Sequence, residues 1–155
     1  MDVRDELIAL LRRSRVEEFN EVSRRRQLVI DLREADLTGA RMERADLQGV
    51  NLDGARLGRA CLAGADLRGA SLRFANLEGA DLEGANLSKA NLYSTYLKGA
   101  RMAGANLHGA DVESAVFPDD VRAEELRMSL ELGTRLRPDP AVGLLRELLE
   151  RPRAG

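Results

Sequence analysis

The side chains best suited to catalysis or metal binding are few: the chain has one histidine, His108, and one cysteine, Cys61. A cysteine nucleophile needs a histidine beside it, and a zinc site needs several Cys, His or carboxylate ligands held close together. A single cysteine also excludes an intramolecular disulfide framework, and it fits a reducing compartment. The sequence therefore predicts a protein that is not an enzyme and holds no metal or cofactor.

Length and composition describe one domain with an unusual core. The chain has 155 residues, 44% of them hydrophobic but only 3% aromatic, with no tryptophan, so small and mid-sized side chains must fill the interior. Its 24 basic and 26 acidic residues give a net charge of -2, and direct nucleic-acid binding is not expected. Neither a signal-peptide pattern nor an apolar run of about 20 residues is present, so we expect no membrane association and a cytoplasmic location.

A period of five residues dominates residues 30–119. Every unit has an apolar centre, most have alanine two residues before the centre, and many have glycine two residues after it. Asp or Asn commonly precedes the centre. The centres are Leu32, Leu37, Met42, Leu47, Leu52, Leu57, Leu62, Leu67, Leu72, Leu77, Leu82, Leu87, Leu92, Leu97, Met102, Leu107, Val112 and Phe117.

This period fits neither an amphipathic helix, which repeats every 3.6 residues, nor a strand, which repeats every two. If each unit forms one side of a square coil, four units bring the chain back after about 20 residues, and successive coils stack about 4.8 Å apart. The centre and the alanine then point inward, and the other three residues point outward. The sequence thus predicts a β-solenoid, with glycine at corners that need unusual backbone angles.

The repeat units resemble those of the pentapeptide repeat family. The resemblance rests on units such as Ala35-Asp36-Leu37-Thr38-Gly39, Ala80-Asp81-Leu82-Glu83-Gly84 and Ala105-Asn106-Leu107-His108-Gly109. It implies an all-β fold, a right-handed quadrilateral β-helix, which here would have about four and a half coils at the strand spacing. It also implies a non-enzymatic role, and some members bind DNA topoisomerases as mimics of a DNA duplex.

The flanking segments are predicted to cover the ends of the tube, with an N-terminal helical cap over residues 1–29 and a C-terminal helical cap and tail over residues 120–155. Apolar spacing predicts a first helix over residues 3–13, and Ser14-Arg15-Val16-Glu17 predicts a capping box that opens a second. A third helix is predicted over residues 121–132, stopped by Gly133. The segment 124–137 is similar to an extension of some bacterial pentapeptide repeat proteins.

The tail carries a broad apolar stripe that needs a surface to cover it. It either folds back on the last coil or mediates association, as a homodimer or with a partner. The stripe includes Leu144, Leu145, Leu148 and Leu149.

Three aromatic residues, Phe74, Tyr93 and Tyr96, take outward positions near one edge of the predicted tube. Flanked by Arg73 and Lys98, they have the composition of an interface anchor. The alternatives are isolated surface rings, or rings that lie beneath a terminal segment. We take these five residues and the tail leucines as the candidate protein interface.

Outward charges balance on three of the four predicted sides. The first side, formed by the units centred on residues 32, 52, 72, 92 and 112, has an excess of three negative charges. The second, third and fourth sides begin with the units centred on residues 37, 42 and 47. It carries Asp31, Glu34, Asp53, Asp111 and Glu113 against Arg33 and Arg73. Mimicry of a phosphate row is therefore disfavoured, except on this side. The sequence favours a protein-protein interaction or scaffold module with an unidentified protein partner, and the alternative is a DNA-mimicking, gyrase-binding protein that gives resistance to gyrase poisons.

Overall fold

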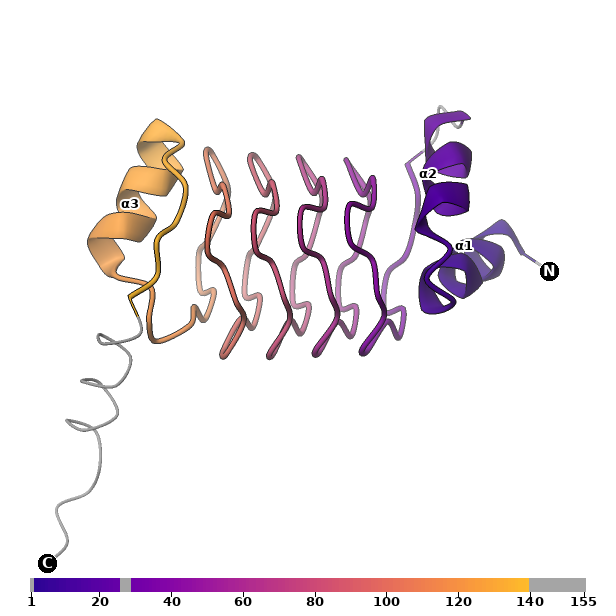
Figure 1. Cartoon of the computed structure of the whole chain (residues 1–155), viewed down its shortest axis with the longest axis horizontal. Helices are drawn as coiled ribbons and strands as arrows, with labels where there is room; N and C mark the ends of the chain where they lie inside the picture. The colour runs from indigo at the N-terminus through magenta and orange to yellow at the C-terminus, as the bar shows by residue number, and fades with distance from the viewer. Residues whose placement is uncertain (1, 26–28, 140–155) are drawn as a thin grey trace, which may run out of the picture.

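The chain winds into a tube of stacked coils in the computed structural model, which describes residues 2–25 and 29–139 (Figure 1). The Leu37 N–H donates to the Arg56 carbonyl at 2.8 Å, and the Arg56 N–H donates to the Ala35 carbonyl at 2.9 Å. Parallel bridges join residues twenty apart throughout, from Asp31–Asn51 to Tyr96–Val116. Each unit therefore pairs with the fourth unit after it, as a square coil requires. The right-handed sense of the coil stays a prediction.

Every unit contains a tight turn. The extended segments between turns are therefore too short to form strands, and they pair only through isolated bridges. The turn closes when the alanine of the next unit donates back to the centre, as Ala40 N–H does to the Leu37 carbonyl at 3.0 Å. The residue two after the centre takes a positive φ, 68° at Gly39 for example. Glycine adopts this backbone region freely, which explains its frequency at the corners.

The core is a column of leucines and alanines along the tube axis. The centres from Leu32 to Leu107 are buried, and Leu77 in the middle is 0% exposed. The last two centres, Val112 and Phe117, are only partly buried against this core. The repeat pattern predicts an inward position for both, and they are less enclosed than the other centres because no complete coil follows them.

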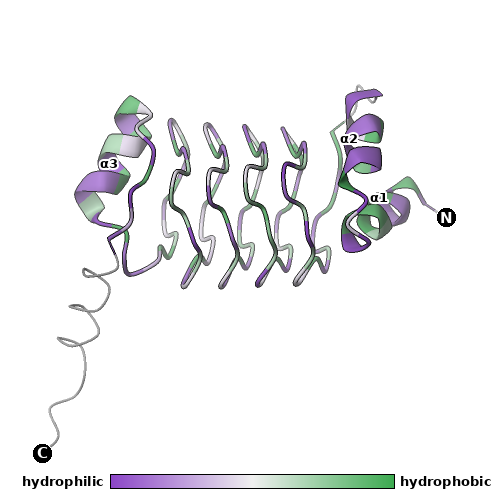
Figure 2. Cartoon of the chain, viewed as in Figure 1, coloured by the Kyte–Doolittle hydropathy of each residue, from purple (hydrophilic) through white to green (hydrophobic). Residues whose placement is uncertain are grey.

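Two helices cover the N-terminal end of the tube: α1 (Val3–Arg12) and α2 (Val16–Arg25) (Figure 1). Both mix hydrophobic and hydrophilic residues along their length (Figure 2), and Leu11 and Phe19 are fully buried in the core. Ser14 separates the helices as expected, but the predicted capping box is wrong. Ser14 has φ 59° and lies in the turn between the helices, two residues before α2 begins.

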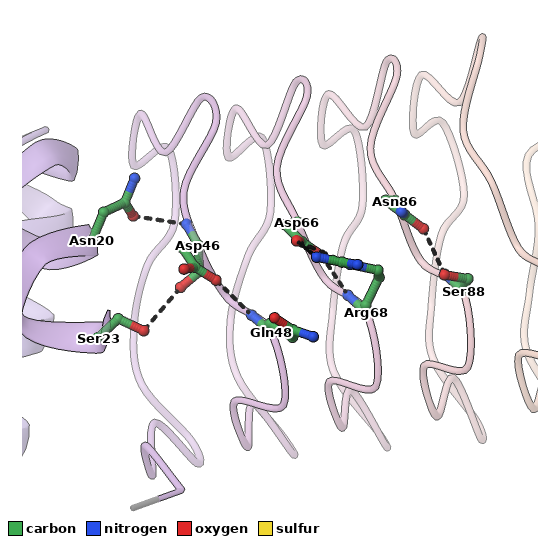
Figure 3. A network of polar contacts seen from close by, with 8 residues as sticks. All are labelled: Asn20, Ser23, Asp46, Gln48, Asp66, Arg68, Asn86 and Ser88. Carbon is green, nitrogen blue, oxygen red and sulfur yellow. Dashed lines mark hydrogen bonds and ion pairs between the residues drawn. The ribbon is translucent and has the colours of Figure 1, made fainter. Parts of the chain in front are cut away.

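The first coil has no earlier coil to pair with, and side chains of the N-terminal cap bind backbone groups that this leaves free of a coil partner. Arg12 Nε donates to the Asp36 carbonyl at 2.7 Å. The side chain of Asn20 accepts the Asp46 N–H at 2.7 Å, and Ser23 Oγ lies 3.4 Å from the Asp46 carbonyl (Figure 3). These contacts protect an edge that would otherwise offer itself for pairing with another chain.

The C-terminal end carries α3 (Ala123–Leu132), which begins two residues later than predicted and is followed by its C-cap Gly133, whose φ is 69°. The chain then returns to the tube. Leu136 is buried, its N–H donates to the Ala105 carbonyl at 2.9 Å, and its carbonyl accepts the Gly104 N–H at 2.7 Å. Residues after the helix thus continue the ladder on one side. None of the helices in the described ranges has the length and the apolar composition of a membrane span.

Candidate protein-binding surface

The first side of the tube is a flat face on which equivalent residues of successive coils stack. Bridges link Asp31, Asn51, Ser71, Asn91 and Asp111 into one column. The outward residues of each unit therefore lie directly above those of the unit twenty residues earlier, as the sequence predicted. This stacking places Arg73 and Phe74 of the third coil next to Tyr93 of the fourth.

Arg73, Phe74 and Tyr93 form one contact cluster, which we call the aromatic patch. The Phe74 and Tyr93 rings meet edge to face, with centroids 5.5 Å apart and an interplanar angle of 80°. The guanidinium carbon of Arg73 lies 5.7 Å from the Phe74 centroid and 5.8 Å from the Tyr93 centroid. Phe74 is 60% exposed. The patch is an ordered apolar surface with a cation held on the rings.

The sequence beneath the patch departs from the usual repeat unit, although the backbone keeps its regular path. Phe74 occupies a corner that is most often glycine, and it keeps the positive φ of that corner at 58°. A bulky side chain is uncommon in this backbone region. Ser71 stands where most units have Asp or Asn. In a regular unit, the side chain of that Asp or Asn accepts the N–H two residues further on, as Asn76 does from Glu78. Beneath the patch, Asp53 from the preceding coil accepts the equivalent N–H. The Asp53 carboxylate accepts the Arg73 N–H at 3.0 Å and the Ser71 hydroxyl.

Thr95 is a further departure at the same corner, since it replaces the inward alanine between Tyr93 and Tyr96. It is 0% exposed, and its hydroxyl donates to the Leu72 carbonyl at 2.7 Å. This bond ties the fourth coil to the third directly beneath the patch. In the repeat pattern Thr95 stands out only as an exception to alanine, although a buried hydroxyl needs a partner and so signals a specific local contact.

Replacing Thr95 by valine is expected to lower the free energy of unfolding by about 1 kcal/mol, because the hydroxyl is lost while its shape is kept. The matched control is Thr134→Val, where the threonine is exposed. Urea denaturation of both variants measures the difference. Equal urea midpoints for Thr95→Val and the wild type would show that the hydrogen bond from Thr95 to Leu72 does not stabilise the fold.

Tyr96 and Lys98 lie around the corner from the patch, on the second side. Together they line an open groove with Arg59, Asn76 and Glu78, and its lining also includes Gly58, Gly79 and Gly99. Val116 of the next coil pairs with Tyr96 and is 45% exposed. As an aliphatic residue, it is not among the aromatic residues that the sequence singled out. Of the five predicted tube residues, the structure therefore brings three into contact and places two in a neighbouring groove.

The four tail leucines of the predicted interface, Leu144, Leu145, Leu148 and Leu149, lie outside the described residues. Their role in capping or association stays a prediction. On the described part of the C-terminal cap, α3 exposes two apolar side chains, Met128 at 39% and Leu132 at 69%.

Ion pairs neutralise many carboxylates of the tube. Arg56 binds Asp36 at 3.0 Å across one coil, and Arg101 binds Asp81 at 3.5 Å in the same manner. On the fourth side Arg68 binds Asp66 at 2.6 Å within its own unit (Figure 3). Such exposed pairs add little stability, but they interrupt any continuous row of negative charge.

On the first side, Arg33 binds Asp31 at 2.7 Å. Hydrogen bonds from the Arg33 side chain and backbone lower the pKa of Asp31 to about 2. Glu34, Asp111 and Glu113 make no ion pair with any residue that the structure describes. This face therefore keeps a negative charge at neutral pH.

Cys61 and His108 lie on different sides of the tube, on the third and the fourth. Partial burial raises the pKa of the Cys61 thiol, which keeps it protonated at neutral pH. His108 packs near Gly133 at the start of the returning segment. Within residues 2–25 and 29–139, no group of three or more His, Cys, Asp or Glu side chains could hold a metal ion.

Comparison with known proteins identifies the repeats. The family model described as pentapeptide repeats matches in 8 copies, over residues 30–69, 51–88, 65–102 and 82–117. No curated protein matches the chain.

Solved structures of similar sequence include two from cyanobacteria. Rfr23 of Cyanothece 51142, a pentapeptide repeat protein, is 35% identical over 59% of this chain and 67% of its own, with a TM-score of 0.39. HetL of Nostoc sp. strain PCC 7120, a pentapeptide repeat protein involved in heterocyst differentiation regulation, is 30% identical over 57% of this chain, with a TM-score of 0.34. The chain spans only 64% of the length of HetL. QnrB1, a plasmid-mediated fluoroquinolone resistance protein, is 20% identical over 81% of this chain and 85% of its own, with a TM-score of 0.39.

Proposed function

Because the chain belongs to the pentapeptide repeat family, we propose that it is a non-catalytic protein-protein interaction module whose contact surface is the aromatic patch. The observation that carries this proposal is the exposed edge-to-face pair of Phe74 and Tyr93 with Arg73 over both rings. Aromatic residues and arginine are enriched among the side chains that dominate binding energy at protein interfaces.

The packing of the tube supports recognition at the surface. The interior is filled by leucine and alanine side chains, so the described tube has no internal cavity lined by polar groups that would orient a substrate. The outer grooves are shallow and mixed in charge, as the one beside Tyr96 shows. A rigid tube with a fixed exposed patch is suited to binding a second macromolecule, because little ordering entropy is lost on contact.

The local structure beneath the patch supports the same proposal. Phe74 holds a backbone conformation that glycine adopts more easily, while Asp53 and Thr95 fix the coils on which the two rings stand. Other non-glycine corners hold the same conformation, Lys89 and Ser94 among them, so the support that is particular to the patch comes from Asp53 and Thr95. A preorganised pair of rings would lose little side-chain freedom when a partner binds.

Capture experiments test the proposal. Immobilised wild-type protein is compared with the double variant Phe74→Ser, Tyr93→Ser in a lysate of the source cell, with bound proteins identified by mass spectrometry. Serine suits both positions, since Ser94 and Ser114 already occupy the same corner with φ 53° and 58°, and Ser88 occupies the place equivalent to Tyr93. We expect at least one protein that the wild type retains and the double variant loses.

Lys89→Ser is the matched control, because Lys89 sits at the equivalent corner of the fourth side with φ 58°. It should capture the same proteins as the wild type, and all three proteins should melt at similar temperatures. Identical captured sets for the wild type and the folded double variant would contradict a role for the patch.

The alternative is a DNA-mimicking protein that binds gyrase and protects it from poisons. The excess negative charge of the first side is the observation that favours it. Against it, arginines pair with carboxylates on the other three sides, as Arg56 does with Asp36, and Arg73 and the two rings interrupt the first side itself. Relief of quinolone inhibition of purified gyrase at stoichiometric protein would favour this alternative over the interaction module.

A further inference from the structure

The face that carries the aromatic patch has a net negative charge. Of the four sides of the tube, only the first carries a net charge, with five carboxylates and two guanidinium groups. Carboxylates lie on both sides of the patch along the stack, Glu34 and Asp53 in the earlier coils and Asp111 and Glu113 in the fifth. With coils about 4.8 Å apart, Glu34 and Glu113 stand roughly 19 Å from one another, with the patch between them.

The cations of this face are already engaged. Arg33 binds Asp31 at 2.7 Å, and the guanidinium of Arg73 lies over Phe74 and Tyr93. From the N-terminal cap, Arg4 reaches this face and donates to the Arg33 carbonyl at 2.5 Å, so positive charge gathers beside the first coil. At the opposite end, Asp111 and Glu113 are exposed and have no ion-pair partner in the described residues.

Asp53 differs from the other carboxylates because it is part of the support of the patch. It is half-buried and accepts bonds from Ser71 and from the Arg73 N–H. Its carboxylate cannot turn away without losing the bonds to Ser71 and to the backbone of Arg73. The fold therefore holds one of the negative charges of this face in place.

We infer that the partner of the aromatic patch presents a basic surface, an apolar side chain flanked by arginine or lysine residues. This inference rests on the proposed function and adds the chemistry of the partner. The apolar side chain would pack on Phe74 and Tyr93, and the flanking cations would meet Glu113 and Asp111 on one side and Glu34 on the other. An acidic partner would face uncompensated like charges and be rejected.

Synthetic peptides test the inference directly. One fluorescein-labelled peptide has a central leucine flanked by arginines, and the other is identical except that glutamate replaces every arginine. Fluorescence anisotropy at low salt should show binding of the arginine peptide and an affinity at least about tenfold weaker for the glutamate peptide. Binding should weaken strongly near 1 M salt, where the screening length falls to about 3 Å. Equal affinities, or no binding above that of the Phe74→Ser, Tyr93→Ser variant, would overturn the inference.

A pair of charge reversals separates a local effect from one of total charge. Glu113→Lys should weaken binding of the arginine peptide about fivefold or more. Glu124→Lys changes the net charge equally, but Glu124 is an exposed residue of α3 and not of this face. The affinity of this variant for the arginine peptide should therefore stay near that of the wild type. If both reversals have the same effect, the site is not on the first side.

The two proposals can fail separately. If captured proteins are lost with the patch variant but retained equally by Glu113→Lys, the patch is an interface and the basic nature of the partner is wrong. If capture does not depend on the patch, the proposed function fails whatever the peptides show.

Discussion

Leu77→Asp is expected to unfold the tube, or to lower its free energy of unfolding by about 3–5 kcal/mol, the usual loss for an unpaired buried charge. Leu77 is 0% exposed, with Leu57 and Leu97 as the equivalent centres of the coils on either side. Among the described residues, no basic side chain belongs to this buried column. A single-domain protein has only about 5–15 kcal/mol of stability to lose, so the variant should melt far below the wild type.

Glu78→Asp is the matched control, because it places the same residue type one position further along the chain, where the side chain is exposed. Its thermal melt by circular dichroism should overlay that of the wild type. A wild-type melting temperature for Leu77→Asp would refute the inward assignment of the repeat centres.

Phe19→Ala should have the second-largest effect, a loss of about 3–5 kcal/mol. Phe19 is the bulkiest fully buried side chain of the described core, and it packs from α2 against the open end of the tube. Removing it leaves a cavity between the helix and the first coil, and it weakens the cap whose Asn20 and Ser23 bind the Asp46 backbone. Urea denaturation measures the loss.

Phe74→Ala makes the same substitution at an exposed ring and should change stability by less than about 1 kcal/mol, since little buried area is lost. The contrast between the two phenylalanines tests whether the N-terminal helices are an integral part of the fold. Similar losses at both positions would show that α2 contributes no more than a surface ring does.

The tube was predictable from sequence because one local rule repeats. A five-residue period with an apolar centre has few solutions, so the inward set from Leu32 to Leu107 and the pairing of residues twenty apart both follow from the repeat itself. The ends have no such redundancy. The predicted capping box at Ser14 is wrong because a short link between two helices has several turn solutions, and sequence alone does not choose among them.

The candidate surface could be predicted only in part. The repeat phase placed Phe74 and Tyr93 in adjoining coils, but their edge-to-face contact and the position of Arg73 depend on side-chain rotamers. Tyr96 precedes its centre and so belongs to the next side, where it lines a groove instead of joining the rings. The hydrogen bonds that Asp53 and Thr95 make beneath the patch join neighbouring coils. The pattern within a single repeat unit does not predict such bonds between coils.

Hydroxyl-radical footprinting with the captured partner tests most directly the claim that the aromatic patch is the binding surface. Aromatic rings and methionine react readily, so Phe74 and Tyr93 report on the patch, and Met128, also exposed, reports on α3 at the end of the tube. The patch account predicts that partner binding lowers oxidation of Phe74 and Tyr93 and leaves Met128 unchanged. Protection of Met128 with full oxidation of Phe74 and Tyr93 would contradict it and place the interface on the C-terminal cap.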